Sequence, residues 1–394
     1  MNNVQDIPLS GTFTQILFDR LHRLLYLLDK GNARVEVLSA DTLQLQTPFA
    51  TGASPAEMAL SADGSWLIIA NTGDGTLSLI DPTNKVNSRI VPAGIPGDTR
   101  NFQPVHIAAT ASGKVFVNYL SARISTGQLR VLDLNSLTFS PVPTDPGCFI
   151  SGCLMESMAG GHKVFFAVIG NSGGSIFQWD DDASNFVNLT GLGDFLSAEA
   201  VAEDANRITV DTRILNRDNQ LESQTSLVDL LAEIASPLVA GRRVHPSGGL
   251  LYLPQVDGAL LFDLQNATVA RAYSGLNLAA TQMGTIALDE TGRIIYAISP
   301  SGIEVATLDS VPLTLGHVSP EAGPSAGGTP VTLRGSGFTS GTQANFGGVP
   351  VTPTFVDSNT IKIVTPKLTP GRVRVSVIQL SGERYDLDAA FQAN

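Results

Sequence analysis

Charged side chains are scarce in this sequence, and the basic ones are the scarcer. Of its 394 residues only 15% are charged, and 24 Lys and Arg stand against 36 Asp and Glu, for a formal net charge of -12. The basic residues form no cluster larger than the pair Arg242 and Arg243. A phosphate backbone or an anionic leaflet would repel such a chain. We therefore expect no nucleic-acid partner.

Long apolar runs are also missing. No stretch approaches the roughly 20 apolar residues of a membrane-spanning helix, and the first residues lack the basic and apolar regions of a signal peptide. The sequence therefore predicts no membrane insertion. It leaves two locations open: the cytoplasm or, if an export signal precedes this sequence, the periplasm, the cell surface or the extracellular space.

Cysteine is limited to Cys148 and Cys153. Two thiols cannot supply a four-ligand zinc site, and His162, the nearest histidine downstream, is not at zinc-finger spacing. A local disulfide and a pair of buried free thiols both stay open.

The carboxylates Asp180–Asp182, with Asp204, suggest a calcium site. The spaced ligands of a dedicated calcium loop are lacking, however, and a solvated turn is favoured. We expect no metal and no cofactor.

Aromatic residues make up only 6% of the chain, whereas it contains 38 Gly and 22 Pro. Short apolar runs between glycine-containing turns favour an all-β fold. In Met58–Asp81, turns at Asp63-Gly64 and Gly73–Gly75 join three such runs, which describes three strands of one propeller blade. The first turn recurs about every 45 residues, the size of a four-stranded blade. Seven such turns predict seven blades: His22, Gly64, Gly113, Gly161, Ala205, Gly248 and Gly292.

The outer strands indicate how the ring closes. Val4–Gly11 resembles Leu45–Gly52, the fourth strand of blade one, so the chain begins with an outer strand that has no blade of its own. The last unit, Gly284–Asp309, has three strands, and we expect residues 4–11 to complete it and remove an exposed edge.

Most third strands end in an aspartate, which typically accepts backbone hydrogen bonds in the next turn. These aspartates are Asp81, Asp133, Asp180, Asp229, Asp263 and Asp309.

The repeating unit resembles a known family. Ala62–Asp81 is similar to the bacterial YVTN-type repeats, which are related to seven-bladed lactonase-like propellers, and the resemblance covers about residues 4–309. Blade five departs most, because the polar loop Arg213–Glu222 replaces its short glycine turn. The resemblance implies a seven-bladed β-propeller, closed by an N-terminal strand, over residues 1–310.

The composition changes after Asp309. Gly316–Phe338, followed by Ile361–Pro366 and Pro370–Val377, resembles an IPT/TIG domain, an immunoglobulin-like β-sandwich, over about residues 312–394. The resemblance implies a second domain over residues 311–394. Because the linker Ser310–Leu315 is short, we expect the two bodies to dock.

Ligands of a propeller usually meet the protein where the innermost strands converge at the mouth of the channel. Seven residues before the aligned turns, three of the seven positions carry candidate ligand-binding side chains: Gln15, Glu57 and His106. Neighbouring positions add Glu156, Glu199, Arg242, Arg243 and Gln282. The apolar neighbours of His106 favour a packed histidine over a base. The glutamates would bind a polar ligand or solvate the pore, and the two arginines would neutralise Glu156 and Glu199 across the channel.

No Walker loop or His-Glu-Xaa-Xaa-His motif is present in the sequence, and no blade matches the functional residues of the lactonase-like family. We therefore predict a monomeric bacterial binding protein, exported or on the cell surface, that recognises a carbohydrate, peptide or protein partner without catalysis. One alternative is a lactonase-like hydrolase acting at the channel mouth. Another is a structural envelope module without a ligand.

Overall fold

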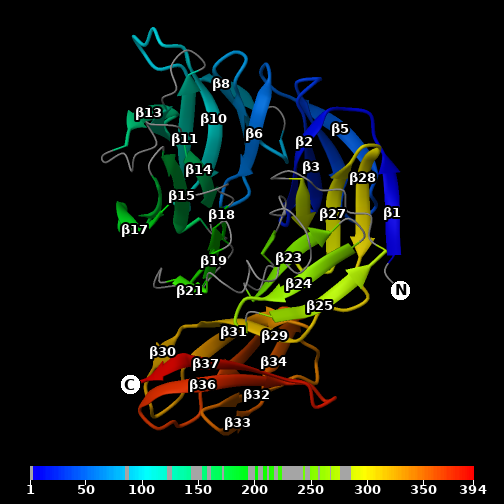
Figure 1. The fold of residues 1–394 in the computed structure, drawn as a ribbon, viewed down its shortest axis with the longest axis vertical. Helices are drawn as coiled ribbons and strands as arrows, with labels where there is room; N and C mark the ends of the chain where they lie inside the picture. Colours follow the sequence, from blue (N-terminus) through cyan, green and yellow to red (C-terminus); the bar gives the residue numbers. More distant parts are fainter. Residues whose placement is uncertain are drawn as a thin grey trace.

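The computed structural model describes residues 3–84, 88–121, 127–142, 153–157, 161–170, 173–193, 200–202, 207–210, 213–216, 221–223, 243–244, 249–255, 258–266, 268–275 and 285–394. Every helix or strand assigned within these residues is a β-strand. The strands form seven four-stranded sheets, followed by a sheet of four and a sheet of five strands. Figure 1 shows the last two sheets stacked as a separate body beside the others.

The first three blades follow the chain in order. Blade one contains β2 (Phe13–Asp19), β3 (Leu24–Asp29), β4 (Arg34–Ser39) and β5 (Leu45–Ala50). Blade two contains β6 (Pro55–Leu60), β7 (Leu67–Asn71), β8 (Thr76–Ile80) and β9 (Arg89–Pro92). Blade three contains β10 (Phe102–Ala109), β11 (Lys114–Ser121), β12 (Gly127–Asp133) and β13 (Thr138–Pro141).

Three further blades repeat this order. Blade four contains β14 (Cys153–Ser157), β15 (Lys163–Gly170), β16 (Gly173–Asp180) and β17 (Asn185–Gly193). Blade five contains β18 (Ala200–Ala202), β19 (Arg207–Val210), β20 (Arg213–Asn216) and β21 (Leu221–Ser223). Blade six contains β22 (Arg243–Val244), β23 (Leu250–Gln255), β24 (Gly258–Asp263) and β25 (Thr268–Ser274).

Blade seven is assembled from both ends of the propeller. Its inner strands are β26 (Ile286–Leu288), β27 (Ile294–Ser299) and β28 (Gly302–Thr307), and its outer strand is β1 (Asn3–Pro8). β1 pairs antiparallel with β28 from Asn3 opposite Thr307 to Pro8 opposite Gly302. The innermost strands contact one another in the cyclic order β2, β6, β10, β14, β18, β22, β26 and back to β2. The prediction of a seven-bladed ring closed by an N-terminal strand is confirmed.

Burial explains why the middle strands are continuously apolar. β7 and β24 are buried along their whole length, because each is covered on both faces by neighbouring blades. One apolar cluster joins blades two and three through residues such as Ile68 and Val117, and another joins blades seven and one through Tyr296 and Leu25. The hydrophobic core is therefore a series of layers between blades.

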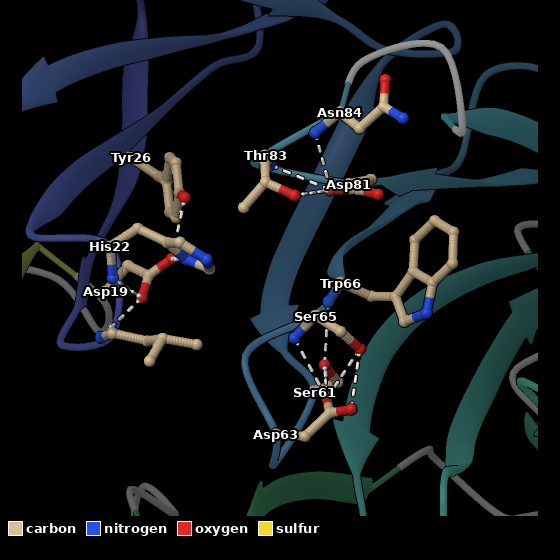
Figure 2. Close-up of polar contacts among 11 residues, drawn as sticks. Asp19, His22, Tyr26, Ser61, Asp63, Ser65, Trp66, Asp81, Thr83 and Asn84 are labelled. Atoms are coloured by element: carbon tan, nitrogen blue, oxygen red, sulfur yellow. Dashed lines mark hydrogen bonds and ion pairs between the residues drawn. The ribbon is translucent and has the colours of Figure 1, made fainter.

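The turn aspartates fulfil the role predicted for them. Figure 2 shows Asp81 accepting the backbone N–H groups of Thr83 and Asn84, both at 2.9 Å. Asp19 and Asp63 cap the first turns of blades one and two in a similar way. Backbone N–H groups also donate to Asp133, Asp180, Asp263 and Asp309. Asp229 lies outside the described residues.

The C-terminal body is a two-sheet sandwich. The first sheet contains β29 (Thr314–Ser319), β31 (Pro330–Ser336), β35 (Thr360–Val364) and β34 (Thr354–Asp357). The second contains β30 (Ala322–Gly323), β37 (Arg384–Ala393), β36 (Gly371–Ile378), β32 (Gln343–Phe346) and β33 (Val349–Val351). Side chains such as Leu333 and Phe346 fill a core between the two sheets.

Contacts among the described residues join the sandwich to blades six and seven. The Tyr385 hydroxyl donates a buried hydrogen bond of 2.9 Å to Asp263 Oδ1 in the turn after β24. The Asn359 side-chain amide donates to the backbone carbonyl of Glu290 at 2.7 Å. Gly249 lies against Thr314, where an added Cβ would come within 3.1 Å of the threonine hydroxyl oxygen. The two bodies are therefore docked through polar contacts, as the short linker suggests.

Candidate functional site

The innermost strands of blades one, two and three share an irregularity. The pairing register shifts between Phe13 and Gln15 in β2, and between Pro55 and Glu57 in β6. In β10 it shifts just before His106. A β-bulge inserts an extra residue, bends the strand and re-aims a side chain, and bulges are frequent beside functional sites. The three aligned positions that the sequence singled out are therefore the three residues that follow these bulges.

Gln15 uses its side chain to join blades one and two. Its amide Nε2 donates to Met58 O at 2.9 Å, and its Oε1 accepts from Met58 N at 2.7 Å. Met58 lies on β6, which is the inner edge of blade two because β7 is its one partner in the sheet. The glutamine amide thus pairs with this edge as a further strand would. This contact assigns Gln15 a structural role that its polarity alone did not indicate.

Glu57 joins blades two and three in the corresponding way. Its Oε2 lies 2.7 Å from Nδ1 of His106, and the two side chains are 23% and 27% exposed, respectively. Burial by itself would lower the pKa of His106, but the hydrogen bond and the negative charge of Glu57 outweigh burial and raise it above the ordinary value. The sequence favoured a packed histidine here, whereas the structure shows a half-buried one held by a carboxylate.

This pair leaves two atoms available for a ligand. Among the described residues, neither Nε2 of His106 nor Oε1 of Glu57 has a hydrogen-bond partner. The protonated imidazole offers an N–H donor at Nε2, and the carboxylate offers an acceptor at Oε1. We call Glu57 and His106 the inner-strand pair.

The other predicted site residues are described only in part. Glu156 lies on β14 and is half-buried. Arg243 begins β22, but its side chain is outside what the structure describes. Glu199, Arg242 and Gln282 lie outside the described residues. The predicted neutralisation of Glu156 and Glu199 by the two arginines therefore stays a prediction.

The acidic run at the end of β16 is tied into the protein. Asp181 accepts from the backbone N–H of Ser112 at 2.7 Å and from the Trp179 indole at 3.1 Å. Asp182 lies 3.2 Å from Nδ1 of His162. Asp204, the fourth member of the calcium hypothesis, lies outside the described residues. Within the described part of the chain, no three His, Cys, Asp or Glu side chains gather into a group that could hold a metal ion.

The structure gives the redox state of one of the two cysteines. Cys153 is disulfide-bonded. Cys148, the other cysteine of the chain, lies outside the described residues. Of the two alternatives that the sequence left open, the local disulfide between Cys148 and Cys153 stays a prediction, with Cys153 in the oxidised state that it requires.

Two stretches have the Gly-Xaa-Ser-Xaa-Gly spacing of a nucleophile elbow, which needs a turn from a strand into a helix. Gly170–Gly174 includes two residues, 171 and 172, that lie outside the described residues. Gly323–Gly327 runs from β30 towards β31 and so lacks the required setting. In the described part of the chain, no helix is long and apolar enough to cross a membrane.

The docked sandwich lies away from the inner-strand pair. Its contacts, Gly249, Asp263 and Glu290, lie at or beside the turns that follow the first and third strands of their blades. Gln15 and Glu57, in contrast, are the third residues of β2 and β6. Because the innermost strands of a ring of equivalent blades run in one direction, the sandwich contacts lie beyond one end of these strands on blades six and seven, whereas Glu57 and His106 lie within β6 and β10 on blades two and three.

Comparison with known proteins identifies the sandwich. A family model for the IPT/TIG domain matches residues 313–388. This part of the chain is an IPT/TIG domain. No curated protein matches the sequence.

Solved structures share the propeller fold. The hydrazine synthase of Kuenenia stuttgartiensis is similar with a TM-score of 0.51 and 13% identity, over 75% of this chain and 95% of that one. The structure of the Dos1 propeller gives a TM-score of 0.53 and 15% identity, over 75% of this chain and 78% of that one. At such identities the likeness establishes the fold alone.

Proposed function

We propose that this chain is a bacterial binding protein, exported or on the cell surface, that acts as a monomer and recognises a carbohydrate, peptide or protein partner without transforming it. The observation that carries this proposal is the inner-strand pair. It is half-buried, already oriented, and has one open donor and one open acceptor. Preorganised polar groups of this kind give binding its specificity.

The electrostatics of the pair favour binding over proton transfer. A histidine that acts as a general base must be unprotonated at the working pH to take a proton. Glu57 raises the pKa of His106, which increases the protonated fraction of the imidazole near neutrality. A protonated imidazole donates a hydrogen bond but cannot act as a base.

The proposed location has its own support. Cys153 is disulfide-bonded. Disulfides form and persist in oxidising compartments and are rare in the cytosol. Export to the periplasm, the cell surface or the medium fits this bond better than a cytoplasmic location does.

One observation favours a second candidate, a lactonase-like hydrolase. A carboxylate hydrogen-bonded to Nδ1 of a histidine is the arrangement that orients an imidazole whose Nε2 removes a proton. The inner-strand pair has this arrangement, with a distance of 2.7 Å. The two candidates therefore differ in the protonation state of His106 and in whether a substrate is consumed.

A paired assay separates them. The full chain and its Glu57→Gln and His106→Gln variants are tested against lactones, including phosphorylated ones, by proton release, and against glycan and peptide arrays. His162→Gln is the matched control, because His162 also contacts a carboxylate, that of Asp182, but its side chain is 64% exposed. We expect array binding that both pair variants weaken and the control leaves unchanged. Lactone turnover lost in both pair variants would promote the hydrolase, and no ligand in any assay would favour a structural envelope module.

A further inference from the structure

We infer that the inner-strand pair binds hydroxyl groups of a neutral sugar. This inference rests on the proposed function and names the ligand class for that site. It depends on three observations. These are the hydrogen-bonding atoms that the pair leaves open, the net charge of the pair, and the edge of β6, where Gln15 already bonds both backbone groups of Met58.

The open atoms match hydroxyl groups. Nε2 of His106 offers a donor and Oε1 of Glu57 offers an acceptor, on side chains held 2.7 Å apart at Nδ1 and Oε2. A hydroxyl group both donates and accepts and rotates to suit its partner, so different hydroxyls of one sugar chain can serve the two atoms.

The charge of the pair argues for a neutral ligand. A protonated His106 and an ionised Glu57 sum to zero, so a charged ligand gains little from the pair as a whole. The chain around it carries a formal net charge of -12. An anionic sugar acid would therefore be repelled at long range without local compensation.

The blocked edge argues against an extended peptide. Such a peptide binds by adding a strand to an exposed sheet edge through main-chain hydrogen bonds. On β6 both backbone groups of Met58 are already taken by Gln15. Bulges also interrupt the edges of β2, β6 and β10. A ligand at this site must therefore be recognised by side chains.

The pair also sets the pH dependence of binding. β10 packs against β6, β7, β11 and β14. Their titratable side chains are Glu57 on β6, Lys114 and Tyr119 on β11, and Glu156 on β14, since β7 has none and Cys153 of β14 is in a disulfide. Lys114 lies 3.6 Å from Asp181, and the Tyr119 hydroxyl is buried. Glu57 is thus the charge in contact with His106, and affinity should fall as pH rises and the imidazolium loses its proton.

The test uses neutral trisaccharides as probes. Maltotriose, cellotriose, mannotriose and chitotriose are titrated into the full chain by calorimetry at pH 6 and pH 8, beside trigalacturonate and a set of neutral peptides. We expect at least one neutral trisaccharide to bind, more tightly at pH 6. Glu57→Gln and His106→Gln should each weaken it about tenfold or more, and His162→Gln less than twofold. Urea denaturation of each variant verifies that it is folded.

The outcomes separate this inference from the proposed function. Trigalacturonate binding as tightly as the neutral sugars, sugar binding indifferent to both pair variants, or no sugar binding at all overturns the inference. A peptide bound through the pair in place of any sugar also overturns it and leaves the proposed binding function standing. Lactone turnover that both pair variants abolish overturns the binding function itself.

Discussion

Gly302 gives the sharpest test of how the propeller closes. It begins β28 with a φ of 143°, and an added Cβ would lie 2.2 Å from Ile7 O and 2.5 Å from Leu9 N. Both are backbone atoms of the N-terminal segment, so no side-chain rotation relieves the contact. Gly302→Ala must therefore push β1 away from blade seven.

The size of the effect follows from two costs. A non-glycine residue at such a φ costs about 1–3 kcal/mol. Displacing the end of β1 disrupts the pairing of Pro8 with Gly302 and the 2.9 Å bond from Leu9 N to Ser301 O, at about 1 kcal/mol for each lost contact. We expect the free energy of unfolding to fall by about 3–5 kcal/mol, out of the roughly 5–15 kcal/mol of a typical domain.

Urea denaturation at equilibrium measures this loss. The matched control is Gly275→Ala, because Gly275 also has a positive φ, of 73°, but no atom of the described residues lies within 4 Å of an added Cβ. It should cost only the backbone strain, about 1–2 kcal/mol. A chain that starts at Thr12 lacks the clashing strand, so in that background the extra cost of Gly302→Ala should vanish. Equal losses for the two glycine variants in the full chain would refute the closure argument.

Tyr385→Phe removes the buried hydrogen bond to Asp263 and should lower the free energy of unfolding by about 1–2 kcal/mol and speed proteolysis between Asp309 and Gly316. Tyr119→Phe is the control and should be neutral, because the Tyr119 hydroxyl has no partner among the described residues. Burial alone would raise the pKa of Asp181, but hydrogen bonds from Trp179 and Ser112 and the charge of Lys114 lower it. The stability that ionised Asp181 contributes should therefore be present at pH 7 and be lost progressively as pH falls below about 4, so the difference between the urea midpoints of the protein and of Asp181→Asn should shrink as the pH is lowered below that value. Thiol titration of the denatured, unreduced protein should find no free thiol; two free thiols would contradict the Cys148–Cys153 pairing, whose removal would cost at most about 2–3 kcal/mol.

The sequence predicted the features that are written in local patterns. The continuous apolar run Leu24–Leu28 and the turn at Asp63-Gly64 each reflect hydrogen bonding and burial within one blade. Ring closure was also predictable, because Val4–Gly11 repeats the pattern of an outer strand that occurs elsewhere in the chain. The observed strand, Asn3–Pro8, begins one residue earlier and ends three residues earlier than that prediction.

The contacts between blades were not predictable in the same way. Glu57 and His106 are 49 residues apart, and their contact depends on the bulges and on the angle between two blades. The alignment placed both residues at the channel mouth, but it could not show that each glutamate or glutamine there reaches the next blade. It therefore grouped Gln15 with the ligand-binding candidates, although both ends of its amide bond to Met58. Tyr385 and Asp263 are 122 residues apart, and nothing local in either sequence indicates their bond.

The position of the IPT/TIG domain bears on how the site is used. It contacts the turns around Asp263 and Glu290 on blades six and seven, whereas the inner-strand pair follows bulges within β6 and β10 on blades two and three. A ligand bound to the pair therefore need not displace the domain, and loosening the domain should not alter the pair. Tyr385→Phe should then reduce stability while leaving sugar affinity unchanged within twofold. If it weakened sugar binding as much as His106→Gln does, the domain and the inner-strand pair would be coupled and the separation argued from their positions on different blades would fail.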